Sequence, residues 1–389
     1  MNIVHVITRL IIGGAQENTL LTCEGLRARG HQVTLVTGPA LGPEGQLLSR
    51  ARKGGYRVEV LDQLRREVHP RDWRACRRLK ELLGQLRPDV VHTHSSKAGI
   101  LGRQAAYSLR RGGLGEMKIV HTIHGLPFHR YGSRIRNAVY VALERRAARQ
   151  SDAIISVADA MTRQALSAGV GRPEQYVTIY SGMEIRDFLD RPAGVEEFRR
   201  GLGLDENSIL VTQVSRLAEL KGHDYILDAA FGIDDPRIHF CFVGDGRRRG
   251  DIQIRIHQLG LAGRVHLTGL APPEQVPLVM HACDILVHCS LREGLARTLP
   301  QAMLAGKPVV AFDVDGAREA VSERTGILLE PGDLPGLKLA ISTLAESPQL
   351  RRSLGQAGRQ LASSRFDHDL MVERIEQLYL RLLGNQRPA

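Results

Sequence analysis

The chain has 389 residues, which is more than a single hydrophobic core usually organises, so two domains are expected. Its 43% hydrophobic and 24% charged residues are those of an ordinary globular protein and exclude collagen-like, mucin-like and disordered chains. Because no apolar run of about 18 residues occurs and the first apolar stretch lacks the flanks of a secretory signal, we expect neither a spanning helix nor secretion.

The net charge of +11 is distributed unevenly along the chain. Residues 1–190 contain 29 Lys and Arg against 17 Asp and Glu, whereas the remainder is nearly neutral. This asymmetry suggests that the first half faces a polyanion, either an anionic membrane surface or a nucleic acid. The five cysteines are scattered and never form a CxxC pair, so a reducing cytoplasm fits better than a disulfide framework or a zinc knuckle.

Short apolar runs alternate with helical patterns through the first half of the chain. One such helical pattern covers residues 71–86, where apolar side chains recur every three or four residues. This alternation is typical of parallel strands joined by crossover helices. The predicted strands are 2–8, 31–37, 56–61, 88–94, 117–124, 152–157 and 176–180.

Residues 181–207 interrupt the alternation with prolines and glycines and indicate a hinge with one short helix. A second series of strands follows at 208–215, 237–244, 264–269, 284–290, 307–313 and 326–331, and helices are expected at 335–346, 350–364 and 368–384. The sequence therefore predicts an α/β protein with two Rossmann-like, doubly wound parallel-sheet domains. We place them at 1–185 and 186–367, with a terminal segment at 368–389.

Ligands of open parallel sheets bind beyond the carboxyl ends of the strands, and two opposed sheets would form a cleft there. Gly13 and Gly14 follow the first strand and precede a helix. They either let a phosphate approach the backbone or simply form a tight turn. The GxGxxG fingerprint is missing, so a nicotinamide cofactor is not expected.

Four histidines lie at the ends of two predicted strands. His92 and His94 end one strand, and His121 and His124 end the next. Alternation along a strand places His121 and His124 on opposite faces, with no carboxylate or cysteine close by, so a metal site is not expected. Strand-end histidines are commonly structural, but His124 directly precedes Gly125 at a carboxyl end and is a catalytic candidate.

The second half offers charged side chains at equivalent places. Arg216 and Lys221 follow the strand at 208–215, where two cations suit a diphosphate, although surface cations are often only solvated. Glu293 precedes Gly294 and a predicted helix, and it either complements the helix dipole or accepts hydrogen bonds from sugar hydroxyls. Asp313 and Asp315 form a DxD pair, which we do not interpret as a metal site because it follows the fifth strand of a second domain.

Seven segments, taken together and in order, resemble the retaining glycosyltransferases of family 4, which have the GT-B architecture of two facing Rossmann-like domains. The segments are IIGGAQ, DVVHTHSSKAGILGR, HTIHG, VSRLAELKGHDYIL, FVGDG, VHLTG and SLREGLARTLPQAMLAGKPVVA. The resemblance covers nearly the whole chain. It also implies that the final helix crosses back onto the first domain.

The resemblance implies roles for individual residues. The Arg and Lys matching Arg216 and Lys221 neutralise the diphosphate leaving group, the His matching His124 contacts the donor sugar, and the Glu matching Glu293 holds the sugar hydroxyls. These four form the expected catalytic set. The full expected donor-binding set is Gly13, Gly14, Arg216, Lys221, Gly244, Leu270, Glu293, Gly294, Leu295, Ala296, Arg297 and Gln301, of which Gly244 and Leu270 would line the nucleobase pocket. His94 and Arg130 are the expected acceptor contacts.

One position departs from the family pattern. The family's Glu-x7-Glu motif begins here at Glu293, but its second member, normally a ribose ligand, is Gln301. An amide offers one accepting oxygen where a carboxylate offers two. We therefore expect weaker donor binding or an altered nucleotide preference, and not a loss of activity.

The expected reaction moves a sugar from a nucleotide diphosphate to a hydroxyl with retention at the anomeric carbon. No cofactor is obligatory, and the co-substrate is a nucleotide sugar, with a UDP-sugar favoured over a GDP-sugar. Two alternatives remain: a nucleotide-sugar epimerase of the same fold and a non-catalytic sugar-nucleotide-binding subunit. The paired cations with Glu293 favour transfer.

The acceptor is inferred from the basic first half. Its exposed cations would form either a solvated face or a docking surface on an anionic leaflet, where a lipid-linked sugar or polysaccharide precursor would be the acceptor. A nucleic-acid partner is not expected, because only 4% of residues are aromatic. We expect a cytoplasmic protein that attaches peripherally to the inner face of the membrane. The cations are Arg65, Arg66, Arg71, Arg74, Arg77, Arg78, Lys80, Arg87, Arg130, Arg134 and Arg136.

Overall fold

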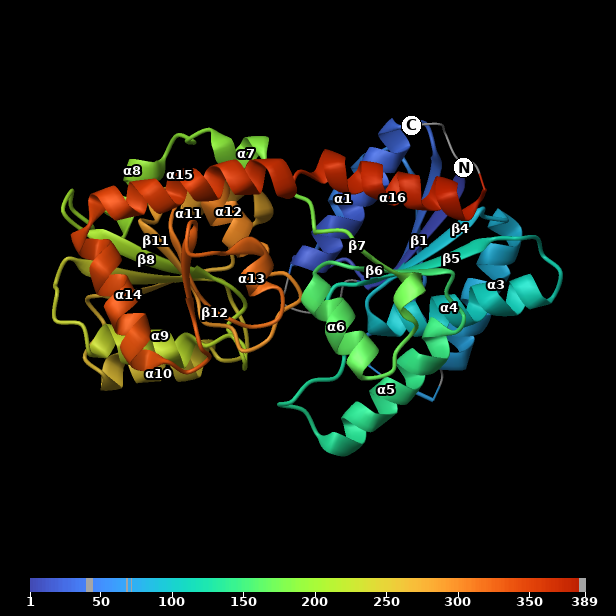
Figure 1. The fold of residues 1–389 in the computed structure, drawn as a ribbon, viewed down its shortest axis with the longest axis horizontal. Coiled ribbons are helices and arrows are strands. Elements are labelled where there is room, and N and C mark those ends of the chain that lie inside the picture. The colour runs from blue at the N-terminus through green and yellow to red at the C-terminus, as the bar shows by residue number, and fades with distance from the viewer. Residues whose placement is uncertain (40–44, 68, 71, 385–389) are drawn as a thin grey trace. The chain divides into compact units, whose positions relative to one another are not determined.

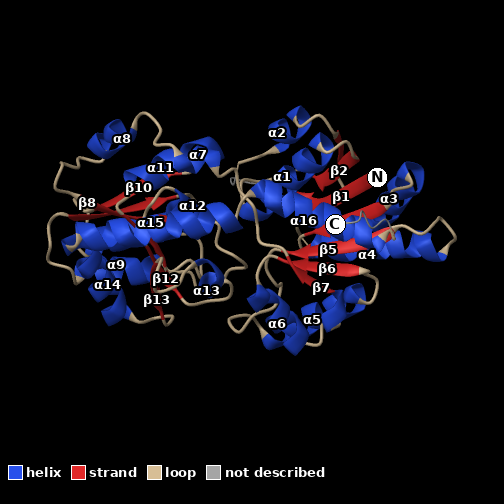
Figure 2. Cartoon of the chain, turned by 45° about the horizontal axis from the view of Figure 1, so that its top comes forward, coloured by secondary structure: helices blue, strands red, loops and turns tan. Residues whose placement is uncertain are grey.

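The computed structural model describes residues 1–39, 45–67, 69–70 and 72–384 and divides the chain into two units (Figure 1). Unit 1 comprises Met1–Met183 together with His368–Ala389, and unit 2 comprises Glu184–Asp367. Arg71, one of the cations named above and the first residue of the helix expected at 71–86, lies outside the described residues. Each unit contains one sheet with helices on its faces (Figure 2).

Unit 1 is built on a seven-stranded sheet of order β3-β2-β1-β4-β5-β6-β7, in which every neighbouring pair is parallel. All seven strands expected in this part of the sequence are present, so the prediction of a doubly wound parallel sheet is confirmed. The strands are β1 Asn2–Arg9, β2 Gln32–Gly38, β3 Arg57–Val60, β4 Val90–His94, β5 Lys118–Ile123, β6 Ala153–Ser156 and β7 Tyr176–Thr178.

Helices cover both faces of this sheet because successive strand residues point to opposite sides. Ile3 and Ile7 of β1 pack with α1 and α16, whereas Val4 and Val6 pack with α3 and α4. The helices are α1 Gly14–Ala28, α2 Leu48–Lys53, α3 Asp72–Leu86, α4 Ser96–Arg111, α5 Arg134–Ala148, α6 Asp159–Ser167 and α16 His368–Leu382, with a 3-10 turn at Pro173–Gln175.

The terminal helix α16 packs against α1, so the expected return of the chain to its first domain is confirmed. The approach is close: a Cβ added to Gly25 of α1 would lie 2.6 Å from Val372 Cγ2. Polar contacts also fix the helix, since Glu376 Oε1 lies 2.7 Å from His31 Nε2 and the hydroxyl of Tyr379 lies 2.5 Å from His92 Nδ1. The last helix is therefore part of the core of unit 1.

Unit 2 contains a six-stranded parallel sheet of order β10-β9-β8-β11-β12-β13. All six expected strands are present: β8 Ile209–Val214, β9 Ile238–Val243, β10 Val265–Gly269, β11 Ile285–His288, β12 Val309–Phe312 and β13 Gly326–Leu329. The helices are α7 Arg186–Leu189, α8 Val195–Gly201, α9 His223–Phe231, α10 Arg249–Gln258, α11 Val276–Ala282, α12 Thr298–Leu304, α13 Ala317–Ala320, α14 Leu334–Glu346 and α15 Pro348–Arg365, with a 3-10 turn at Pro273–Gln275.

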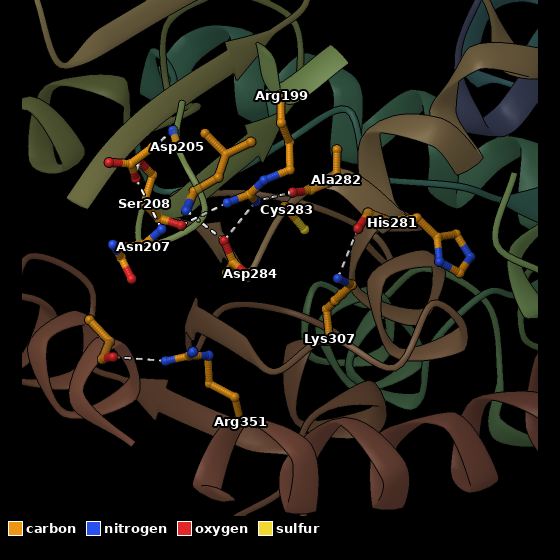
Figure 3. Close-up of polar contacts among 12 residues, drawn as sticks. Arg199, Asp205, Asn207, Ser208, His281, Ala282, Cys283, Asp284, Lys307 and Arg351 are labelled. Carbon is orange, nitrogen blue, oxygen red and sulfur yellow. Dashed lines mark hydrogen bonds and ion pairs between the residues drawn. The ribbon is translucent and has the colours of Figure 1, made fainter. Parts of the chain in front are cut away.

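The segment expected to hold one short helix contains two, α7 and α8. Pro192 and Gly194 separate them, because proline lacks an N–H and Gly194 has a φ of 91°. Arg199 of α8 then fixes the amino ends of the central strands, donating to Ser208 O at 2.7 Å and pairing with Asp284 at 2.8 Å (Figure 3). Arg199 thus stabilises the end of the sheet opposite the loops that follow the strands.

The helices of the described residues are too short or too polar to span a bilayer; none combines sufficient length with sufficient hydropathy.

Candidate active site

The loop after β8 carries Arg216 and Lys221 and is held against the end of β11. Gly222 has a φ of 73°, and a Cβ added to it would lie 1.9 Å from the carbonyl oxygen of Cys289. Any side chain at this position would therefore be strained and would collide with backbone. This close approach brings Lys221 to the loop that follows β11.

Backbone and side-chain hydrogen bonds join the two loops. The buried Gln213 donates from Nε2 to Lys221 O at 2.9 Å, and its Oε1 accepts from Cys289 N at 3.3 Å. In addition, Leu291 N donates to Leu220 O at 2.8 Å. Because the buried Gln213 amide forms hydrogen bonds to both loops, it holds them at a fixed separation.

Gly244, expected to line a nucleobase pocket, supports the Arg216 loop from the side of β9. A Cβ on Gly244 would lie 2.0 Å from Ser215 O, and one on Gly246 would lie 2.4 Å from Leu217 O. Both glycines have positive φ values, of 145° and 159°. Because Gly244 and Gly246 have no side chains, the backbone of the loop after β8 packs directly against the FVGDG segment. Arg216 itself is exposed in that loop.

Lys221 and Glu293 form the polar centre of unit 2. Lys221 Nζ lies 2.5 Å from Glu293 Oε1, and His288 Nε2 lies 3.1 Å from the same oxygen. The Lys221 and Glu293 side chains are 19% and 18% exposed. Burial tends to raise the pKa of Glu293, but the charge of Lys221 and then the hydrogen bond from His288 outweigh it and hold that pKa well below its usual range. Glu293 is therefore a carboxylate at neutral pH.

Asp315 positions the Glu293 loop. Its Oδ2 accepts a hydrogen bond of 2.6 Å from the backbone N–H of Glu293, and its own φ is 50°. The other aspartate of the DxD pair, Asp313, forms an ion pair with Arg318. Both carboxylates of the pair are thus engaged with groups of the protein.

The sequence analysis assigned no role at this site to three residues: His288, Arg292 and Asp315. His288 ends β11, and His124 directly follows β5. This shared position at a strand end could have identified His288 as a site residue. Arg292 is partly buried; burial lowers its pKa, while Asp315 and Glu293 oppose that shift. Arg292 precedes Glu293 in the chain, but no local signal indicated that it would also lie near Asp315.

The remaining expected donor-binding residues of unit 2 follow β11 or β10. Gly294, Leu295 and Ala296 are buried between Glu293 and α12, and Arg297 precedes that helix. Gln301 lies within α12 with 8% exposure. Leu270 follows β10 and is 41% exposed. Of the expected set, the structure thus brings Lys221 and Glu293 into direct contact.

In unit 1 three histidines, His5 of β1, His94 of β4 and His124 after β5, form a chain of rings. His5 Nδ1 lies 3.0 Å from His94 Nε2, and His94 Nδ1 lies 3.1 Å from His124 Nε2. His94, expected to contact an acceptor, is 1% exposed and lies in the interior between the other two. Its ring nitrogens are both directed at neighbouring histidines, so any effect it has on a ligand passes through His124.

His5, His92 and His94 place nitrogen atoms within 4.8 Å of one another, a spacing compatible with a metal ion. Five of their six nitrogens already have protein partners, because His92 also contacts Tyr379 and Thr122 at 2.5 and 2.7 Å. Burial lowers the pKa of all three, that of His5 to about 3, so the rings are neutral. The donor set fits a hydrogen-bonded network better than a metal.

His121 lies on the opposite face of the sheet, as strand alternation predicts. Its Nδ1 is 2.9 Å from Thr93 Oγ1, and a Cβ on Gly99 of α4 would come within 2.5 Å of its Cε1. Burial lowers its pKa well below the usual value. His121 is thus a core residue packed under α4, separate from the His5–His94–His124 chain.

Of the three other expected residues of unit 1, Gly13 and Arg130 lie in loops, and Gly14 is the first residue of α1. Gly13 precedes α1 with an extended φ of 171°, and its carbonyl oxygen accepts from Gln16 N and Glu17 N at 3.1 and 3.0 Å. Arg130 is exposed beyond β5, with its guanidinium 4.8 Å from the ring centre of Tyr131 and a hydrogen bond of 2.7 Å to the Tyr131 hydroxyl.

Models of two protein families match successive parts of the chain. The family described as "Glycosyl transferase 4-like domain" matches residues 13–182, and the one described as "Glycosyl transferases group 1" matches residues 194–361. The fold is similar to that of Anabaena HepE, solved in complex with UDP-glucose, with a TM-score of 0.83, 26% identity and coverage of 97% of this chain and 99% of that one.

Two curated relatives match over most of their length. The Escherichia coli UDP-Gal:alpha-D-GlcNAc-diphosphoundecaprenol alpha-1,3-galactosyltransferase is 27% identical, with 99% of this chain and 98% of that protein covered. The Streptomyces fradiae 2-deoxystreptamine N-acetyl-D-glucosaminyltransferase is 29% identical, with 96% and 92% covered. With two matching families in order and a GT-B fold, the chain belongs to the family 4-like GT-B glycosyltransferases, which use nucleotide sugars.

Proposed function

We propose that this protein is a retaining glycosyltransferase that moves a hexose from a UDP-sugar to a hydroxyl of a lipid-linked or polysaccharide-precursor acceptor. The observation that carries the proposal is the Lys221–Glu293 contact of 2.5 Å beside the Arg216 loop. A fixed cation and a fixed carboxylate at the carboxyl ends of adjacent strands suit a charged diphosphate joined to a hydroxyl-rich sugar.

Lys221 and Arg216 would act on the diphosphate. The ammonium group of Lys221 has three hydrogens, and the contact with Glu293 uses one of them, so others remain for phosphate oxygens. Arg216, exposed in the same loop, would take two oxygens with its planar guanidinium. Glu293, held ionised by its neighbours, would accept from the sugar hydroxyls.

The transfer step balances without a separate base. The bond between the anomeric carbon and the β-phosphate oxygen breaks, and the bond to the acceptor oxygen forms on the same face of the sugar. The acceptor proton passes to the departing phosphate oxygen, whose negative charge the two cations stabilise. Because side-chain cations already supply that charge, we propose that no metal is obligatory.

His124 is the proposed contact of unit 1 with the donor sugar. We assign His94 and His5 to positioning His124, because each ring lies about one hydrogen bond from the next. Gly13 and Gly14 would approach the phosphates, and Arg130 would meet the acceptor. The remaining proposed contacts with the nucleotide or sugar are Gly244, Leu270, Gly294, Leu295, Ala296, Arg297 and Gln301.

The acceptor assignment is supported by the E. coli relative, whose name gives a diphosphoundecaprenol acceptor, and by the basic first half of the chain. We therefore propose that the protein acts at the cytoplasmic face of the membrane. The Streptomyces relative is named for a 2-deoxystreptamine acceptor and favours a second candidate, transfer to a small soluble aminocyclitol. Comparing undecaprenyl-linked and free sugar acceptors distinguishes the two.

Arg216→Ala tests the proposal. We expect turnover to fall by about two to three orders of magnitude, as when one oxyanion-stabilising group is lost, and the anomeric proton coupling of the product to show retention. The control is Arg352→Ala, which removes an exposed arginine of α15. Turnover within a few-fold of wild type would remove Arg216 from the reaction.

A panel of nucleotide sugars measured by thermal shift identifies the donor, because a ligand that binds only the folded state raises its stability. Product analysis without acceptor then distinguishes the other two functions. An epimerase would interconvert the bound sugar, whereas a non-catalytic subunit would bind it and neither hydrolyse nor transfer it.

A further inference from the structure

Helix α5 leaves an apolar stripe uncovered on the surface of unit 1. Ile135, Val139 and Leu143 are 80%, 53% and 39% exposed and follow each other at intervals of four residues, which places neighbours on one side of a helix. Tyr131, four residues before Ile135, is 42% exposed. We call these four residues the α5 stripe. They are four of the nine large hydrophobic side chains exposed among the described residues.

The chain segment that carries the α5 stripe, residues 130–150, has exposed positive charge and no exposed acid. Between residues 130 and 150 the sequence contains one acid, Glu144, which is 4% exposed and pairs with Arg103 at 2.7 Å. The same interval contains six exposed arginines: Arg130, Arg134, Arg136, Arg145, Arg146 and Arg149. The surface therefore combines an apolar line with cations on its flanks.

The carboxyl-terminal half of α5 attaches the helix to unit 1. Ala147 and Ala148 are buried, and the Arg103–Glu144 pair joins α5 to α4 in the interior. Arg145 also donates from Nε to Ala168 O at 2.8 Å. Because the helix is already formed and anchored, binding through its free half requires no folding of the segment. Figure 1 shows α5 at the outer edge of unit 1.

We propose that the α5 stripe inserts into the interface of an anionic lipid bilayer, with the arginines contacting lipid phosphates. A helix with an apolar stripe, basic flanks and low overall hydropathy is suited to lie in the plane of a membrane surface. The charge argues against a second copy of the chain as the occupant, because two identical basic helices would repel each other. This inference rests on the proposed function and adds to it the surface through which the enzyme reaches a lipid-linked acceptor.

Vesicles of phosphatidylglycerol and phosphatidylcholine test the proposal by sedimentation at low and high salt. We expect Ile135→Ser/Val139→Ser to lower the vesicle partition coefficient about tenfold or more at both salt concentrations, because the apolar contribution is not screened. Arg134→Gln/Arg136→Gln should lower it chiefly at low salt. The matched control Ile254→Ser/Leu339→Ser removes two apolar side chains of unit 2 that are 58% and 69% exposed and should leave binding unchanged.

A fluorescent reporter checks insertion directly. Trp73 is the single tryptophan, so Ile135→Trp in a Trp73→Phe background reports on the stripe alone. Its emission should shift to shorter wavelength with anionic vesicles and stay unchanged with pure phosphatidylcholine. No shift, or equal binding by the serine variant and wild type, would overturn the proposal. So would a wild-type dimer in sedimentation velocity that Ile135→Ser/Val139→Ser dissociates, since the stripe would then bind a second copy.

The outcome is separable from that of the proposed transferase. The serine variant should transfer sugar to a short, water-soluble acceptor within about twofold of wild type, while losing transfer to vesicle-embedded acceptor. Conversely, Arg216→Ala should bind vesicles like wild type. Vesicle binding by a protein that transfers no sugar would retain the α5 inference and reject the transferase proposal.

Discussion

Lys221 and Glu293 lie 72 residues apart in the chain, yet their side chains meet at 2.5 Å. A largely buried ion pair of this kind is costly to break on one side, because the remaining charge keeps its desolvation cost. The pair therefore has a structural effect and, if the proposed function holds, a chemical one. The two can be measured separately.

Lys221→Met should lower the free energy of unfolding by about 1–3 kcal/mol, because Glu293 loses its contact with the Lys221 ammonium group and retains the longer one with His288. Turnover should fall by about a hundredfold or more with the loss of the phosphate-facing charge. Urea unfolding and sugar-transfer rates measure the two effects. In Lys221→Met/Glu293→Gln we expect stability to recover and turnover to stay low; recovery of both would limit the pair to a structural role.

Gln301→Glu tests the departure from the family motif at the residue scale. A second accepting oxygen with a charge should strengthen a ribose contact by about 1 kcal/mol, which lowers the donor Michaelis constant roughly fivefold. Steady-state kinetics with UDP- and GDP-sugars provides the measurement, and thermal stability without nucleotide serves as the control, because Gln301 is 8% exposed. Unchanged constants and nucleotide choice would show that residue 301 does not contact the ribose.

At the scale of elements, the spacing between the ends of β8 and β11 decides whether the site exists. Gly222 sets that spacing, since its φ of 73° and the nearby Cys289 carbonyl leave no room for a side chain. The periodicity of the sequence placed both strands but carried no information about this approach. β8 and β11 are about 70 residues apart in the chain, and they become neighbours only through the order of strands in the sheet.

Gly222→Ala should therefore destabilise unit 2 by about 1–3 kcal/mol. It should also reduce turnover, because the loop must move and displaces Lys221. Gly250→Ala is the matched control: nothing lies within 4 Å of its added Cβ, and it lies inside α10, where alanine favours the helix by about 0.5–1 kcal/mol. Thermal unfolding and transfer rates would compare them. Equal behaviour of the two variants would contradict the argument.

At the scale of the whole molecule, buried neutral histidines make stability depend on pH. Burial lowers the pKa of His5 to about 3 and holds the pKa values of His92, His94 and His121 well below their usual range. In the unfolded chain each would titrate near 6.5. The unfolded state thus binds more protons below that pH, so the contribution is present above about pH 6.5 and is lost as the pH falls.

Between pH 7.5 and 5.5 these four histidines should together lower the free energy of unfolding of unit 1 by about 5 kcal/mol. Urea unfolding at each pH, followed in β4 by pulsed hydrogen exchange at one common pH, measures the loss. His121→Asn should reduce it by about a quarter, because Thr93 keeps a polar partner while one titrating group is removed. The control His257→Gln, at an exposed position of α10, should leave it unchanged. A pH-independent stability would show that the buried rings do not titrate on unfolding.

The sequence by itself determined the thirteen described strands and the two parallel sheets, because alternation and turn residues are local signals repeated in order. The returning last helix and the family came from the resemblance of the ordered motifs to a known family. Only the tertiary structure decided that His94 is interior, that Asp315 supports Glu293, and that Ile135, Val139 and Leu143 are exposed. Their spacing alone is that of a core-facing helix. Burial and contact depend on which distant element covers a face, and a local pattern does not contain that information.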